Sequence, residues 1–228
     1  MFNYEVDPAL LVPLVPRGTE LDTWNGTTYA SLVAFRFQRT RILGIPIPLH
    51  RDFEEANLRF YVRRQSRGGL RRGVVFIREI VSRRAVAALA RWSYNEPYRA
   101  LPMRSSVETT PHLSVQYSWQ LSGAWHSIAA RTRQPLALPG DGSFEQFIAE
   151  HYWGYTRQTD GSTIEYHVTH PPWALAPAES YRIDADLTAV YGPAIAARLA
   201  KPASVFLANG SPVTVSRPVS LERDQEES

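Results

Sequence analysis

Short apolar runs, separated by glycine, proline, asparagine and serine, dominate this chain and predict a mainly β fold with a few short helices. The clearest pair, 56–64 and 73–81, predicts a hairpin around Gly68-Gly69. Aromatic and β-branched residues at 107–121 and 124–132 predict a second hairpin around Ser122-Gly123. The fold class expected from these patterns is therefore α+β with predominantly antiparallel strands.

Other segments carry weaker strand and turn signals. Asn-Gly pairs favour the positive φ angles of tight hairpin turns, so hairpins are expected at 21–29, and between 204–207 and 213–216. Strands are also expected at 31–38, 162–170 and 181–185.

Helices are predicted only where a start signal precedes a suitable run. Asp7-Pro8 begins a short helix to Leu14, and Ser143 with Gln146 forms a capping box for another. An alanine-rich stretch at 83–94 and the segment 193–199 after a proline are further candidates. The proline-rich segment 42–49 is expected to be a loop whose apolar side chains cover a pocket.

The length of 228 residues, with no linker or internal repeat, predicts one domain over 1–221 followed by a disordered acidic tail at 222–228. The chain has no cysteine, which excludes disulfides and thiolate chemistry. It also has no signal-like start and no apolar run long enough to span a membrane. We expect a cytoplasmic protein without membrane association.

Positive charge gathers in one part of the chain. The segment 36–104 holds sixteen arginines and five acids, a net +11, against +3 for the whole chain. We expect folding to interleave this segment with acidic strands; an anion-binding face is the alternative. Nucleic-acid binding is not expected, because no aromatic residue lies among the arginines of the hairpin tip to stack on a base: Arg63, Arg64, Arg67, Arg71 and Arg72.

The sequence lacks the motifs of common hydrolases, metalloproteases and nucleotide-binding enzymes, so we expect no cofactor. Glu165, His167 and His170 suggest a metal site, but on a strand His170 points away from the other two. We expect no metal.

The segment 74–81 is apolar except for Arg78 and Glu79, so it reads as a strand buried on both faces with at least one charge directed inward. Its partner strand places Asn57 and Arg59 on one face. In one register Arg59 lies opposite Glu79 as an ion pair. In the register shifted by one, Arg59 faces Arg78 and the two form a clamp for a carboxylate.

Four segments resemble the YqjF-like family of uncharacterised bacterial proteins: 4–11 (YEVDPALL), 50–59 (HRDFEEANLR), 94–103 (YNEPYRALPM) and 151–155 (HYWGY). That family is grouped with acetoacetate decarboxylase. The resemblance implies a cone-like antiparallel β barrel with helices outside and a buried pocket. His50, Glu96 and Met103 lie in these segments and are further candidates for the site.

Acetoacetate decarboxylase uses two adjacent lysines after a proline, and the first forms a Schiff base with the substrate. The matching positions here hold Tyr98 and Arg99. Tyrosine has no amine and arginine stays protonated, so neither forms that imine. The single lysine, Lys201, matches no catalytic position. Schiff-base decarboxylation is therefore not expected.

Three functions remain open at this point. The first is a protein that binds a small organic acid or apolar metabolite in the pocket, through Arg99, Arg59, Arg78, Asn57, His50 and Met103. The second is a lysine-independent lyase, hydratase or isomerase with Tyr98, Glu79 or Glu96 as acid or base. The third is a protein that binds a macromolecular partner, and association into a homo-oligomer is possible for each.

Overall fold

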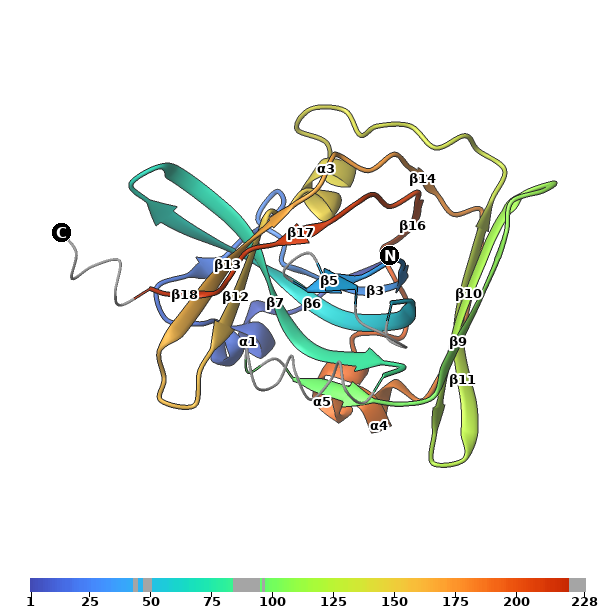
Figure 1. The fold of residues 1–228 in the computed structure, drawn as a ribbon, viewed down its shortest axis with the longest axis horizontal. Coiled ribbons are helices and arrows are strands. Elements are labelled where there is room, and N and C mark those ends of the chain that lie inside the picture. The colour runs from blue at the N-terminus through green and yellow to red at the C-terminus, as the bar shows by residue number, and fades with distance from the viewer. Residues whose placement is uncertain (43–44, 47–50, 84–94, 96, 222–228) are drawn as a thin grey trace.

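Most strands of the chain join one large, strongly curved sheet (Figure 1). The computed structural model describes residues 1–42, 45–46, 51–83, 95 and 97–221. In that part of the chain the large sheet comprises β1 (Phe2–Glu5), β2 (Glu20–Leu21), β3 (Tyr29–Phe37), β6 (Phe53–Ser66), β7 (Gly69–Val81), β8 (Tyr98–Ala100), β12 (Trp153–Arg157), β13 (Thr163–Thr169), β14 (Leu175–Pro177), β16 (Ser204–Ala208), β17 (Thr214–Val215) and β18 (Val219–Ser220).

The remaining strands form two smaller sheets. Four of them pair in the order β15-β11-β10-β9, and two form a ribbon of their own. Their bounds are β9 (Met103–Glu108), β10 (Leu113–Leu121), β11 (Ala124–Thr132) and β15 (Ser180–Asp184) for the four-stranded sheet, and β4 (Arg41–Ile42) and β5 (Ile45–Pro46) for the ribbon.

The expectation of a closed barrel is wrong. The large sheet runs in the order β14-β16-β1-β3-β6-β7-β12-β13-β17, and no pairing among the described strands joins its two ends. Closure fails because β9, β10, β11 and β15 pair only with one another and do not continue the large sheet. The chain keeps a mainly β architecture with an open, curved sheet.

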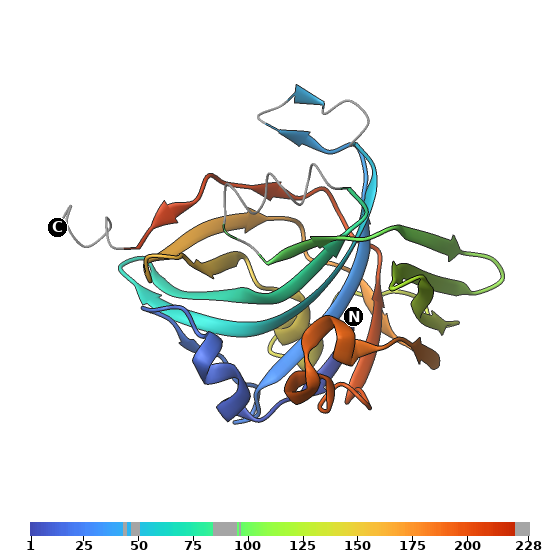
Figure 2. The same ribbon diagram turned by 90° about the horizontal axis from the view of Figure 1, so that it is seen from below.

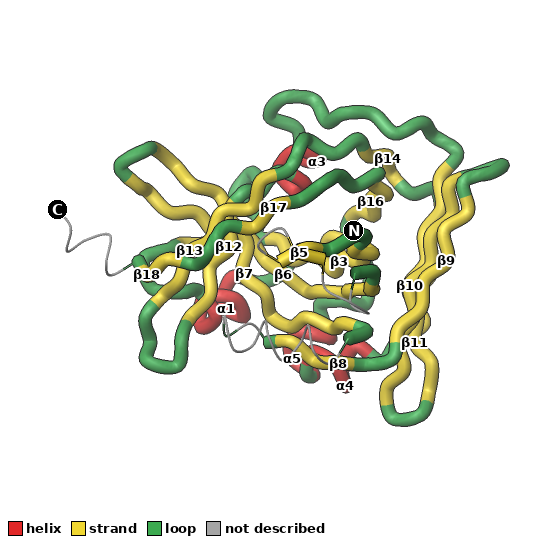
Figure 3. The backbone as a smooth tube through the Cα atoms, viewed as in Figure 1, coloured by secondary structure: helices red, strands yellow, loops and turns green. Residues whose placement is uncertain are grey.

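The helices are short and lie on both faces of this sheet (Figure 3). They are α1 (Pro8–Leu11), the 3-10 turn η1 (Val12–Leu14), α3 (Phe144–Ala149), α4 (Leu187–Tyr191) and α5 (Pro193–Ala196). Figure 2 shows α3 inside the curve of the sheet and α1, α4 and α5 outside it. Among the described residues, no helix is long and apolar enough to span a membrane.

Alternation of side chains along the strands gives the sheet two different faces. The outer face carries Leu58 and Phe60 and packs against α1, α4 and the four-stranded sheet in the largest apolar cluster. The inner face carries Tyr61, which packs with Phe147 and Ile148 of α3 in a second cluster. The inner face is less apolar and also carries buried polar residues.

Several predicted elements are confirmed. Asp7 accepts a hydrogen bond from the Ala9 amide at the start of α1, and Ser143 accepts one from the Gln146 amide at the start of α3. The hairpins β6–β7 and β10–β11 both form, the second around Ser122-Gly123 as expected. The turn of the first is Arg67-Gly68, one residue before the predicted Gly68-Gly69, because Gly69 pairs with Ser66.

Three predictions need correction, and one helix was not predicted. The expected strand 107–121 is two antiparallel strands, β9 and β10, because Pro111 lies in a turn between them. The expected hairpin of 204–207 with 213–216 does not form, since β16 pairs with β1 and β14 while β17 pairs with β13. At 21–29 only the Asn25-Gly26 turn forms, and Leu21 pairs with β6 instead. Helix α4 was not expected.

The arginines of the β6–β7 hairpin mostly serve the fold. Four of the five make ion pairs with acids on other segments, so folding interleaves the basic segment with acidic ones as expected. The pairs are Arg63 with Glu20 at 2.8 Å, Arg64 with Glu165 at 3.2 Å, Arg71 with Glu165, and Arg72 with Asp22 at 2.6 Å.

Three predictions fall wholly or partly outside the described residues. They are the helix at 83–94, the loop at 42–49 and the disordered tail at 222–228.

Candidate functional site

A group of buried polar side chains occupies the inner face of β6. Strand alternation directs Glu55, Asn57, Arg59 and Tyr61 to this face, opposite the apolar core on the outer face. Glu55 is 2% exposed and Asn57 1% exposed, so both are removed from water. Charged side chains such as that of Glu55 are seldom fully buried unless they are paired or take part in a functional site.

Polar residues of β6, β7 and β8 lie side by side across these three neighbouring strands. Asn57 of β6 pairs in register with Glu79 of β7, and Glu79 pairs with Tyr98 of β8. Glu79 is 1% exposed. The Asn57 amide donates a hydrogen bond to Glu55 Oε1 at 2.9 Å, and the Tyr98 hydroxyl donates one to Glu55 Oε2 at 3.2 Å. We call Glu55, Asn57, Glu79 and Tyr98, with Arg59, the inner polar cluster.

A β-bulge decides which charge of β7 joins this cluster. The register shifts between Leu58 and Arg59, whose partners are Arg78 and Phe76, so Ile77 is the extra residue. Both registers considered from the sequence are therefore wrong: Arg59 lies opposite neither Glu79 nor Arg78. The bulge turns Glu79 to the inner face and leaves Arg78 opposite Leu58 on the outer face.

The environment of Glu55 changes its acidity. Burial raises the pKa of Glu55 to about 7, although hydrogen bonds from Asn57 and Tyr98 and the charge of Arg59 act to lower it. Apolar Phe53 and Val81 lie on the same face and exclude water. Glu55 can therefore both give and accept a proton near neutrality, which suits a general acid or base.

Arg59 is the cation of the cluster. It is half-buried, and its Nη2 lies 3.5 Å from the Ile148 carbonyl oxygen of α3, a long hydrogen bond. Among the described residues, neither Arg59 Nε nor Asn57 Oδ1 has a hydrogen-bond partner, although both atoms are buried. A buried polar atom without a hydrogen-bond partner costs about 1–3 kcal/mol. A ligand that supplied these hydrogen bonds would remove this cost, so both atoms are candidates for ligand binding.

Beside Arg59, a chain of hydrogen bonds fixes the neighbouring side chains. The Tyr61 hydroxyl lies 2.6 Å from Ser31 Oγ, which donates to Asn3 Oδ1 at 2.7 Å. Asn3 in turn donates to Ser204 Oγ at 2.9 Å. This network holds the strands around Arg59 in place and has no charged member.

His151 stands next to this network. Its ring lies 4.5 Å from the ring of Tyr61, and its Nε2 is 3.7 Å from Asp22 Oδ2. Burial lowers the pKa of His151 to about 4, so the ring is neutral near pH 7.

The residues predicted from sequence divide into three groups. Asn57, Arg59, Glu79 and Tyr98 come together in the inner polar cluster. Arg78, Arg99 and Met103 do not, since Arg78 and Arg99 are in register with residues of the outer face and Met103 packs against the outer core. His50 and Glu96 lie outside the described residues.

Glu55 is the residue that sequence reasoning missed. The sequence contained a pattern that could have identified it. Glu55 and Asn57 are two positions apart in a segment rich in apolar residues, and on a strand this spacing places both side chains on one face. The predicted strand began at residue 56, whereas β6 begins at Phe53, so Glu55 lay outside the prediction.

The described residues contain no group of three metal-ligating side chains. Glu165, one of the residues considered for metal binding, is held by Arg64 and Arg71, and Arg71 lies over the Trp153 ring at 4.1 Å. Its role is therefore in the packing of β12 and β13 against the hairpin.

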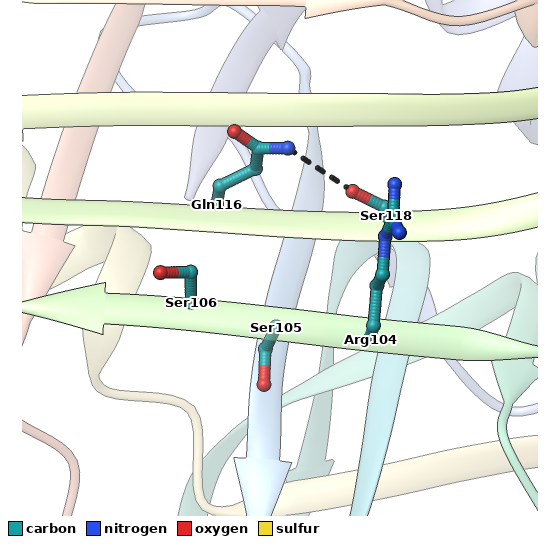
Figure 4. Close-up of a pocket in the computed structure, with 5 residues that line it drawn as sticks. All are labelled: Arg104, Ser105, Ser106, Gln116 and Ser118. Atoms are coloured by element: carbon teal, nitrogen blue, oxygen red, sulfur yellow. Dashed lines mark hydrogen bonds between the residues drawn. The ribbon is translucent and has the colours of Figure 1, made fainter.

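The surface of the described residues has hollows away from the inner polar cluster. One of about 70 Å³ lies on β9 and β10, where Gln116 Nε2 donates to Ser118 Oγ at 3.3 Å (Figure 4). Another, of about 260 Å³, lies between the β14–β15 connection and β16. Neither hollow is lined by a residue of the inner polar cluster. We place the candidate site at the cluster because its buried carboxyl groups and the guanidinium of Arg59 can bind a charged ligand or transfer a proton.

Comparison with known proteins assigns the family. The model of DUF2071, described as an uncharacterized conserved protein, matches residues 1–212. The chain belongs to the DUF2071 family. The uncharacterized protein YqjF of Bacillus subtilis (strain 168) is 29% identical to this DUF2071 chain over 181 residues, 78% of this chain and 72% of YqjF. The resemblance inferred from the four sequence segments is confirmed.

Solved structures show the fold to which this DUF2071 chain is similar. Acetoacetate decarboxylase from Legionella pneumophila superposes with a TM-score of 0.61 at 15% identity, over 96% of this chain and 81% of that protein. The enduracididine biosynthesis enzyme MppR with HEPES bound gives 0.62 at 12% identity, over 96% and 84%. At such identities the likeness establishes the fold alone.

Proposed function

We propose that this DUF2071 chain binds a small organic acid at the inner polar cluster, with Arg59 holding the carboxylate of the ligand. The observation that carries the proposal is the buried Glu55 carboxyl, held by Asn57 and Tyr98 on the same face as the guanidinium of Arg59, whose Nε has no partner among the described residues. Near neutrality Glu55 is partly protonated and can donate a hydrogen bond to an anion. A cation and a neutral carboxyl together suit a carboxylate ligand better than an apolar metabolite.

A structure of similar fold supports this choice of ligand class. MppR has been solved in complex with pyruvate, and superposes on this chain with a TM-score of 0.56 at 12% identity, over 96% of this chain and 82% of that protein. Pyruvate is therefore the first probe for this chain.

Thermal unfolding tests the proposal directly. Pyruvate and other small carboxylates should raise the melting temperature of the wild-type protein by several degrees at about one hundred times the dissociation constant. The shift should disappear in Arg59→Gln and persist in Arg131→Gln, a matched change on the exposed surface of β11. A shift that survives Arg59→Gln would place binding elsewhere, and a shift only with apolar compounds would reject the carboxylate.

A second candidate function, lysine-independent acid–base catalysis, follows from the acidity of Glu55. A carboxyl with a pKa of about 7 beside a bound keto acid can remove a proton next to the carbonyl and return it, as a lyase, hydratase or isomerase requires. Exchange of the pyruvate methyl protons with deuterated water, followed by NMR, should therefore be accelerated by the wild-type protein and not by Glu55→Gln. Mass spectrometry after borohydride treatment should show no adduct, since no lysine lies in the cluster.

A further inference from the structure

One edge of the four-stranded sheet is unpaired in the part of the chain that the structure describes. Strand β9 ends the order β15-β11-β10-β9 and has β10 as its only partner in that sheet. Figure 2 shows the β9–β10 hairpin extending past the large sheet. An exposed strand edge presents free amide and carbonyl groups that can pair with another strand.

The geometry of the hairpin defines which groups face that free edge. The Gln120 amide donates to the Pro102 carbonyl at 2.9 Å, so even-numbered residues of this strand direct their backbone groups to β10. The amides and carbonyls of Met103, Ser105 and Val107 therefore point away from β10. No proline interrupts these six residues, and the Val107 side chain is 56% exposed.

The sequence of β9 is complementary to itself in antiparallel pairing. With Ser106 opposite Ser106 on a two-fold axis, Ser105 lies opposite Val107 and both pairs use outward-facing backbone groups. The same register places Arg104 of each copy opposite Glu108 of the other, on one face of the sheet. Shifting the axis to Ser105 or Val107 removes this contact between opposite charges.

We propose that two copies of this chain associate through β9 in this register and form a continuous eight-stranded sheet. The partner is a second copy, because both charged positions of the strand are satisfied by its own sequence. Arg104 is exposed, and its guanidinium lies over the Trp125 ring at 4.2 Å. In the dimer it exchanges this exposed ring contact for the carboxylate of Glu108 of the second copy. In this register five residues of β9 in each copy, 104–108, lie opposite one another, and so small a contact predicts a weak dimer.

Charge reversal tests the register. Arg104→Glu places like charges opposite each other twice in the dimer, and Glu108→Arg does the same with the opposite sign. Each should raise the dimer dissociation constant roughly tenfold or more in sedimentation equilibrium. An equimolar mixture of the two variants should recover the dimer, because every facing pair then has opposite charges.

A second variant separates loss of association from loss of folding. Val107→Pro removes an outward-facing amide without removing a hydrogen bond to β10, so it should abolish the dimer and leave the melting temperature close to that of the wild type. A wild-type protein that stays monomeric at all concentrations would overturn the proposal. A dimer whose dissociation constant is unchanged in all three variants would also overturn the proposal. The same holds if the Arg104→Glu and Glu108→Arg proteins fail to form a dimer when mixed.

Discussion

At the scale of single residues, burial determines the chemistry of the inner face. Glu55 is enclosed between β6, β7 and β8, and its hydrogen bonds from Asn57 and Tyr98 do not offset the loss of water around its charge. The Tyr98 hydroxyl, on β8, donates to Glu55 Oε2 at 3.2 Å. The sequence suggested Tyr98 as a site residue, but the partner of its hydroxyl depends on the packing of β8 beside β7.

The raised pKa of Glu55 predicts how stability depends on pH. The folded protein binds the proton of Glu55 more tightly than the unfolded chain, so the contribution of Glu55 to stability is fully present below its ordinary pKa of 4.5 and is lost as pH rises through about 7. The loss is roughly 3 kcal/mol between these values. Glu55→Gln should remove this fall. Urea denaturation of both proteins at several pH values measures the difference.

Comparison of the two pH profiles isolates Glu55 from other groups. Burial of His151 acts in the opposite direction, since its pKa is lowered to about 4 and stability is lost as pH falls below its ordinary value of 6.5. His151 is present in both proteins and cancels in the difference. Parallel profiles for the wild type and Glu55→Gln would show that Glu55 titrates normally.

At the scale of elements, the hairpin β6–β7 was predictable and its register was not. The apolar runs on either side and the glycines near the turn predict the existence of the hairpin. The bulge at Ile77 reverses the alternation for the rest of β7, and a single extra residue leaves no mark in the pattern of apolar positions. This is why the sequence left open which of Arg78 and Glu79 faces inward.

The junction between β7 and β12 gives a prediction at this scale. Gly73 pairs with Trp153, and a Cβ at Gly73 would lie 2.7 Å from the Trp153 carbonyl oxygen. Gly73→Ala should therefore destabilise the protein by about 1–3 kcal/mol. Gly140→Ala, where no atom lies within 4 Å of the added Cβ, is the control. Equal midpoints of urea unfolding for the two variants would contradict this packing.

At the scale of the whole molecule, the sequence predicted the mainly β composition and the family, while pairing between distant segments remained hidden. Strand β16 lies beside β1, about two hundred residues earlier in the chain, with Phe2 opposite Val205. Such pairing depends on the complete core, so the local Asn209-Gly210 signal suggested a hairpin that does not form. For the same reason the open sheet could not be distinguished from a closed barrel.

The single domain over 1–221 stays a prediction at this scale. The outer core is consistent with it, because it joins Phe2 and Val205 at the two ends of the chain with Leu58 and Phe60 of β6. Binding of an organic acid at the inner polar cluster is the central claim about this molecule.

Calorimetric titration of pyruvate at about one pH unit below and above 7 tests that claim most directly. Protonated Glu55 favours a carboxylate ligand and ionised Glu55 repels it, so we predict tighter binding at the lower pH, with uptake of a proton at the higher pH. Glu55→Gln should bind with nearly equal affinity at both. Absence of binding by the wild type at either pH, or the same pH dependence in Glu55→Gln, would contradict the account.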